Sequence, residues 1–179
     1  ANRIENFITL TLISISSSLV TVIGMFYGAK KYRLIKPMIK YTTFWAMTIG
    51  SIFSVLCFLF MDRVAPIFFP SNDIVDISMK KSAIDSTIEY YKFMAISYPF
   101  VGLTMVSSRA MQAIGVAWPM MIITFSRVIV LQCSLCYVFI ILFEKDVYWA
   151  WIAISISCII AGLIAYFMRL YFINKLISK

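Results

Sequence analysis

Five long apolar segments limit what this chain can fold into more than any other feature. Each reaches the length of about 20 residues that a helix needs to cross a bilayer core. Inside lipid, backbone N–H and C=O groups need partners within their own segment, which favours helices. Of the 179 residues, 62% are hydrophobic and only 13% are charged. The sequence therefore predicts an all-α integral membrane protein, a single transmembrane domain over 1–179 with five transmembrane helices at about 7–26, 42–61, 93–112, 119–143 and 147–171.

The charged residues between these segments alternate in sign along the chain. The link between the first two segments holds five basic residues and no acidic one, whereas the stretch 62–92 holds five of the eight acidic residues. Basic loops stay on the cytoplasmic side of a membrane. We therefore expect a multi-pass protein of the plasma membrane with its N-terminus outside and its C-terminus cytoplasmic. The net charge of +8 follows from this sorting, so we expect no nucleic-acid partner.

Several kinds of chemistry lack the residues that they need. The chain contains no His, which excludes histidine bases and zinc–histidine sites. Cys133 and Cys136 form a CxxC pattern, but inside an apolar segment this pattern is more typical of small packing residues than of metal or redox work. A GxxxxGK phosphate loop is also missing. We expect no enzyme activity, no catalytic residue, no metal and no cofactor.

Two shorter stretches have helical patterns of their own. The basic stretch 30–40 interleaves lysines with apolar residues and predicts an amphipathic helix lying at the membrane interface. In the stretch 82–92, Ile84, Ile88 and Tyr91 have helical spacing that leads into the third span. The first residue is Ala1, and no short basic leader precedes the first span. An N-terminus outside the cell then indicates the C-terminal part of a longer protein.

The first span carries a polar stripe. Ser14, Ser17, Ser18 and Thr21 follow an i, i+3, i+4, i+7 spacing and so share one face of a helix. Such a face lines a polar cavity, or it lets helices approach closely while each hydroxyl bonds to a carbonyl of its own helix. We name Ser14, Ser17 and Thr21 as candidate substrate-binding residues.

The third span contains a proline within an apolar sequence. Pro99 follows Ser97 and Tyr98, and it removes a backbone hydrogen bond from the helix. Broken helices often mark substrate sites in transporters, because freed carbonyls then face a cavity. The alternative is an ordinary kink beside a lipid-facing methionine stripe. The candidate substrate-binding residues in this span are Ser97, Tyr98, Val101, Thr104 and Met105.

Two arginines border or interrupt the apolar segments. Arg109 ends the third span, where its long side chain can reach cytoplasmic headgroups. Arg127 lies eight residues beyond Pro119, about 12 Å deep along a helix. An ionised group at that depth usually faces protein or water. Because none of the spans contains an acid, we expect its partner to be a carbonyl, a phosphate, water or a group on a part of the protein that this sequence lacks.

Two motifs resemble those of a known transporter family. The stretch 24–31 reads GMFYGAKK, and 109–121 reads RAMQAIGVAWPMM and is followed by Arg127. They are similar to the G…GA and QaiG…P…R patterns of the multidrug and toxic compound extrusion family. The resemblance assigns structural or gating roles to Gly24, Gly28, Pro99, Arg109, Gln112, Gly115, Pro119 and Arg127.

The resemblance implies both an architecture and an activity. Members of this family have twelve helices in two pseudo-symmetric lobes, and this chain matches about the last five helices. They export organic cations and drugs in exchange for protons or sodium ions. The second-lobe cavity is lined by the helices matching 7–26 and 93–112 and by a seventh helix that this sequence lacks. The implied partners are membrane lipid, small organic cations, and a missing N-terminal lobe of the same protein or another copy.

Some features of the chain depart from this family pattern. Some branches carry a carboxylate where this chain has the apolar pair Phe100 and Val101, which argues against sodium coupling through this lobe. Five helices also cannot form a two-lobed cleft alone. Two alternatives therefore stay open: a lipid-linked sugar flippase of the same superfamily, whose cavity would use Arg127 and Arg109, and a membrane subunit that does not transport.

Overall fold

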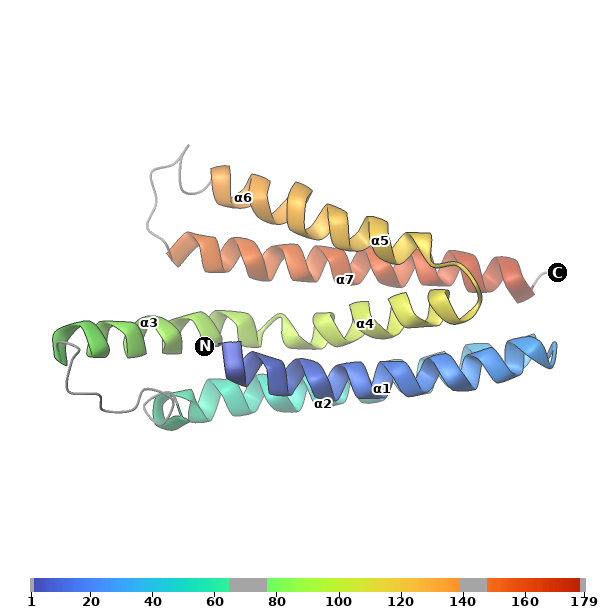
Figure 1. Ribbon diagram of the computed structural model, residues 1–179, viewed down its shortest axis with the longest axis horizontal. Coiled ribbons are helices and arrows are strands. Elements are labelled where there is room, and N and C mark those ends of the chain that lie inside the picture. Colours follow the sequence, from blue (N-terminus) through green and yellow to red (C-terminus); the bar gives the residue numbers. More distant parts are fainter. Residues whose placement is uncertain (1, 65–76, 139–147, 178–179) are drawn as a thin grey trace.

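The computed structural model describes residues 2–64, 77–138 and 148–177, and all regular secondary structure in these ranges is helical. Long helices run back and forth along one common direction (Figure 1). The turn after α1, the turn after α4 and the C-terminal end of α7 lie at the same end of the bundle (Figure 1). In chain order the elements are α1 (Asn2–Gly28), α2 (Tyr32–Val64), α3 (Ile77–Ala95), α4 (Tyr98–Ala113), α5 (Trp118–Phe125), the π-helix η2 (Ser126–Cys133), α6 (Ser134–Tyr137) and α7 (Tyr148–Ile177).

Four helical stretches are long and apolar enough to cross a membrane. They are Ile8–Gly28, Tyr32–Val64, Trp118–Tyr137 and Trp149–Ile177, and they correspond to the first, second, fourth and fifth predicted spans. The third predicted span, 93–112, is divided between the end of α3 and the 16-residue α4. Neither α3 nor α4 alone is among the stretches that are long and apolar enough to cross. The prediction of an all-α, multi-pass membrane fold is thus confirmed.

Two predicted boundaries need correction. The sequence predicts the second span at 42–61 behind a separate interfacial helix, but α2 begins at Tyr32 and includes the basic stretch from that residue on. The reason lies in packing, because the buried positions Ile35, Ile39, Thr43 and Ala46 form one continuous stripe at helical spacing. The described part of the fourth span ends at residue 138, so 139–143 lies outside the described residues, as does the first position of the span 147–171.

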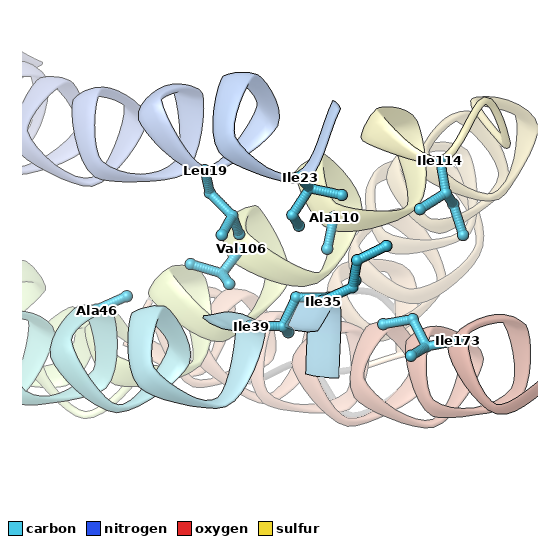
Figure 2. Packing of buried hydrophobic residues seen from close by; sticks show 9 residues of the cluster. All are labelled: Leu19, Ile23, Ile35, Ile39, Ala46, Val106, Ala110, Ile114 and Ile173. Atoms are coloured by element: carbon cyan, nitrogen blue, oxygen red, sulfur yellow. The ribbon is translucent and has the colours of Figure 1, made fainter. Parts of the chain in front are cut away.

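The helix α4 occupies the centre of the bundle and packs against α1, α2 and α7. A hydrophobic cluster joins these four helices near the end of the bundle where α1 turns into α2 (Figure 2). Because lipid tails are as apolar as these side chains, the cluster stabilises the bundle through close van der Waals packing and not through removal of apolar surface from water. The cluster consists of Leu19, Ile23, Ile35, Ile39, Ala46, Val106, Ala110, Ile114 and Ile173.

Three glycines allow the helices to approach α4 closely. A methyl group added at Gly50 of α2 would lie 2.9 Å from the carbonyl oxygen of Tyr98, and one at Gly102 would lie 3.0 Å from the carbonyl oxygen of Ala46. On the other side of α4, a methyl group at Gly162 of α7 would lie 3.0 Å from the carbonyl oxygen of Phe100. Small residues at helix contacts are typical of membrane bundles, because they permit backbones to touch.

Candidate functional site

A cavity of about 220 Å³ lies between α1, α4, α5 and the π-helix η2. Its wall mixes apolar side chains, hydroxyl groups and two guanidinium groups. None of its described lining residues is acidic. The lining residues are Ile13, Ser16, Val101, Thr104, Met105, Ser108, Arg109, Met120, Ile123, Thr124 and Arg127.

One face of α4 forms the largest part of this wall. Val101, Thr104, Met105 and Ser108 follow the i, i+3, i+4, i+7 spacing that places side chains on one face of a helix. The hydroxyl of Thr104 donates a hydrogen bond of 2.8 Å to the carbonyl oxygen of Phe100, so its oxygen remains able to accept from a ligand. The structure thus brings together three of the predicted substrate-binding residues: Val101, Thr104 and Met105.

The side chain of Arg127 reaches the cavity from the π-helix. A π-helix is wider than an α-helix, and such segments are frequent at functional sites. Its Nη1 atom lies 3.9 Å from the Sγ atom of Cys158 on α7. Sulfur is only a weak acceptor. This partner was not among those expected from the sequence, and it leaves most of the hydrogen-bonding capacity of the guanidinium to the cavity.

Arg109 approaches the same cavity from the end of α4. Its Nη1 atom donates a 3.1 Å hydrogen bond to Oε1 of Gln112, which lies one turn further along the helix. This bond orients the guanidinium. The sequence predicted that Arg109 would reach for lipid headgroups, whereas the structure places it half-buried in the cavity wall. The two arginines therefore make the cavity electropositive.

The predicted polar stripe of the first span does not line this cavity. Ser14, Ser17 and Thr21 lie exposed on another face of α1, and the hydroxyl of Ser14 donates to the carbonyl oxygen of Leu10 at 2.9 Å. Ser16 lines the cavity instead, fully buried, with its hydroxyl 3.0 Å from the carbonyl oxygen of Ile13. The stripe was identified from polarity alone, and the rotation of α1 against α4 decides which face turns inward.

Two predicted residues of the third span also lie elsewhere. The hydroxyl of Ser97 donates a 2.7 Å hydrogen bond to the carbonyl oxygen of Met94, across the break between α3 and α4. Tyr98 lies in a hydrophobic cluster with residues of α1, α2 and α3 rather than in the cavity wall. Pro99 stands in the first turn of α4, where its missing N–H leaves no helical bond unmade. At this break, the side chains of Ser97 and Tyr98 are therefore buried in the core of the bundle.

The glycines and the proline of the family motifs occupy helix ends. Gly115 has φ +83°, a left-handed conformation that favours glycine, in the turn between α4 and α5. Pro119 lies buried in the first turn of α5. Gly24 and Gly28 have open space around them among the described residues, so neither makes a tight helix contact there. The close contacts belong to Gly50, Gly102 and Gly162, which the motif comparison did not indicate.

Sequence reasoning missed several residues of the cavity wall. Ser108 shares the α4 face of Thr104 and Met105, as its spacing indicates, but it is not among the predicted substrate-binding residues. Met120, Ile123 and Thr124 come from α5, where the i, i+3, i+4 spacing is present but every neighbour is also apolar. In such a uniformly apolar segment, periodicity cannot distinguish the side that faces a cavity from the side that faces lipid.

Comparison with protein families gives one match that covers most of the chain. The family model described as MatE matches residues 1–138. A search of curated protein sequences found no match.

Solved structures with the same fold include several transport proteins. A multidrug resistance MATE family transporter of the MOP superfamily in its inward-facing conformation superposes with a TM-score of 0.86 at 20% identity, over 99% of this chain and 39% of that one. A multidrug resistance MATE family transporter of the MOP superfamily in an outward-facing conformation gives a TM-score of 0.81 at 18% identity, over 99% of this chain and 38% of that one. A MATE structure in complex with MaL6 gives a TM-score of 0.89 at 20% identity, over 99% of this chain and 38% of that one. The chain thus spans less than two-fifths of each of these proteins.

Proposed function

The chain belongs to the MatE family, and on that basis we propose that it forms part of the second lobe of a secondary active transporter, which exports organic cations and drugs in exchange for protons or sodium ions. The observation that carries this proposal is the cavity between α1, α4, α5 and η2. It supplies what an adaptable organic-compound site needs: flexible methionines, apolar surface and a few hydroxyl groups. In this proposal the protein moves its substrate without changing it covalently.

The proposed transport unit contains more than this chain. The solved structures of this fold carry the matching region as less than two-fifths of their length. We propose that a further lobe, from the same polypeptide or from another copy, closes the cavity and supplies the carboxylate for ion coupling. The described cavity wall offers no acid for that purpose. We place the unit in the plasma membrane with the C-terminus of α7 in the cytoplasm, because basic residues concentrate at that end of the bundle.

A second candidate function follows from Arg109 and Arg127. A cation placed 6 to 8 Å from Arg127 would be repelled by roughly 2 to 3 kcal/mol at an effective dielectric constant of about 20. An organic cation must therefore bind further away or beside a carboxylate of the other lobe. An anionic compound at the same distance, such as a lipid-linked sugar phosphate, would be attracted to Arg127 by a similar energy. The electropositive wall favours this flippase activity as the alternative.

One pair of variants tests whether the cavity binds the exported compound. Val101→Phe fills the cavity, and we expect it to lower efflux of a dye cation such as ethidium at least severalfold with unchanged expression. Val55→Phe makes the same change on the exposed surface of α2, and we expect normal efflux. Efflux is measured in cells that lack other exporters and express the intact protein. Equal efflux by both variants would exclude this cavity from the transport path.

A charge variant separates the two candidate functions. Arg127→Gln removes the positive charge and keeps a shorter, polar side chain. If organic cations are exported, we expect their apparent affinity to rise by up to about 100-fold where they bind 6 to 8 Å away, because a repulsion of roughly 2 to 3 kcal/mol disappears. Where they bind further away, we expect their affinity to stay the same. If an anionic compound is the substrate, we expect its transport to fall by a similar factor. Loss of cation efflux at normal expression would contradict the first proposal.

A further inference from the structure

A second cavity, of about 360 Å³, opens between the first turns of α2 and the last turns of α7. It shares no lining residue with the cavity described above. Three cationic side chains line it, Lys36, Lys40 and Arg169, and none of its described lining residues is acidic. Three positive charges around one cavity without a counter-ion indicate a site for an anion.

Arg169 lies at the inner end of this cavity with only 4% of its surface exposed. Its Nη1 atom donates a 2.6 Å hydrogen bond to the hydroxyl of Thr43, and its guanidinium carbon lies 4.8 Å above the ring of Tyr166. The Nε atom is buried and has no hydrogen-bond partner among the described residues. These contacts hold the guanidinium in place but do not neutralise it. A buried cation of this kind is costly unless an anion accompanies it.

Two lysines extend the positive region from Arg169 toward the surface. Lys36 Nζ lies 3.5 Å from Oδ1 of Asn174, which positions the ammonium group beside the end of α7. Lys40 stands one turn further along α2 and is exposed. An arginine fork with nearby ammonium groups matches the several oxygens of a phosphate group better than a single carboxylate.

The remaining wall of the cavity is apolar and faces the surface of the bundle. Phe44 and Met47 line it on the side toward the middle of the membrane, and Phe44 is 65% exposed. This surface suits an acyl chain, while the basic end suits a headgroup at the membrane interface. Basic pockets between transmembrane helices bind anionic headgroups in this way.

We propose that the cavity between α2 and α7 binds one anionic phospholipid, with its phosphate on Arg169, Lys36 and Lys40 and an acyl chain along Phe44 and Met47. The site is separate from the substrate cavity, so the proposal does not depend on which compound the protein exports. Because α2 and α7 both pack on α4, such a lipid would join the two outer helices at their basic ends.

Native mass spectrometry of the intact protein in detergent tests this proposal. Phosphatidylglycerol and phosphatidylcholine with identical acyl chains are titrated separately. We expect phosphatidylglycerol to bind at least tenfold more tightly than phosphatidylcholine. Lys36 and Lys40 lie at the exposed mouth of the cavity. In the double variant Lys36→Gln/Lys40→Gln, we expect the affinity for phosphatidylglycerol to fall by about tenfold or more.

The matched control is Lys31→Gln/Arg33→Gln, which removes two exposed positive charges nearby that do not line the cavity. We expect it to retain phosphatidylglycerol affinity within about twofold. Equal binding of the two lipids to the unaltered protein would overturn the proposal, as would an equal loss of affinity in both double variants. Inorganic phosphate is titrated as a third probe. If it binds as tightly as phosphatidylglycerol, with the same dependence on Lys36 and Lys40, the assignment to a lipid is wrong.

Discussion

At the scale of single residues, the absence of a side chain decides how closely this bundle packs. Gly50 and Gly102 bring the backbones of α2 and α4 together, and Gly162 does the same for α4 and α7. Each of these glycines lies inside a helix, where glycine is less favourable than alanine by about 0.5–1 kcal/mol. The packing at the contact must therefore contribute more than that amount.

Replacing Gly50 with alanine tests this argument. A Cβ atom there would lie 2.9 Å from the carbonyl oxygen of Tyr98 and 3.0 Å from the Cα atom of Pro99, so backbone would have to move. Overpacking costs about 1–3 kcal/mol, which exceeds the gain in helix propensity. We expect Gly50→Ala to lower the free energy of unfolding by about 1–2 kcal/mol. The apparent melting temperature of the intact protein in detergent measures this loss.

Gly24 provides the matched control, because nothing among the described residues lies within 4 Å of an added Cβ atom there. Gly24→Ala should keep or slightly raise the melting temperature. If Gly50→Ala and Gly24→Ala melted at the same temperature, close backbone contact would not limit the packing of α2 against α4.

At the scale of elements, two prolines with different positions have opposite consequences. Pro99 stands in the first turn of α4, where a helix has no bond for its N–H to make. Pro37 is the sixth residue of α2, where it removes the bond to the carbonyl group of Arg33. The sequence indicated a kink at Pro99, and the structure shows a full break at the two residues between α3 and α4.

Alanine substitutions of these prolines should therefore change stability in opposite directions. Pro37 is exposed, so Pro37→Ala restores a helical bond without removing a buried contact. We expect the free energy of unfolding to rise by about 2 kcal/mol, because an interior proline costs about 3 kcal/mol and restricts the unfolded chain by about 0.4–1 kcal/mol. Pro99→Ala gives the unfolded chain more freedom, and we expect a fall of about 0.4–1 kcal/mol. Both are measured by denaturant-induced unfolding of the intact protein in detergent micelles. A gain in stability from Pro99→Ala would mean that the proline strains the break instead of supporting it.

At the scale of the whole molecule, the charge distribution predicts how the bundle lies in the membrane. The end that holds the turn from α1 to α2 carries the basic stretch 30–40, whereas the opposite end carries Asp62, which forms an ion pair with Lys92 at 2.9 Å. Positive charge stays on the cytoplasmic side during insertion. Because this argument concerns charges over entire loops, it does not depend on any single helix contact.

Single cysteines test this orientation in a background in which the four native cysteines are replaced. We expect Asp62→Cys to react with a membrane-impermeant maleimide in right-side-out vesicles, and Lys31→Cys to react only after the vesicles are opened. Both positions are exposed, so access to the reagent depends on the side of the membrane. The loss of an exposed ion pair at Asp62 should cost less than about 1 kcal/mol. If Lys31→Cys reacted in sealed vesicles and Asp62→Cys did not, the orientation of the bundle would be the opposite of the one predicted.

The sequence by itself determined the all-α membrane fold and four of the spans as continuous helices, because length and hydropathy relative to the bilayer are local properties of a segment. It also indicated the cavity face of α4, where Thr104 and Ser108 stand out at helical spacing from apolar neighbours. Only the tertiary structure decided that Ser16, and not Ser14 or Ser17, turns inward from α1. The rotation of each helix depends on contacts between helices, and no pattern within one segment contains that information.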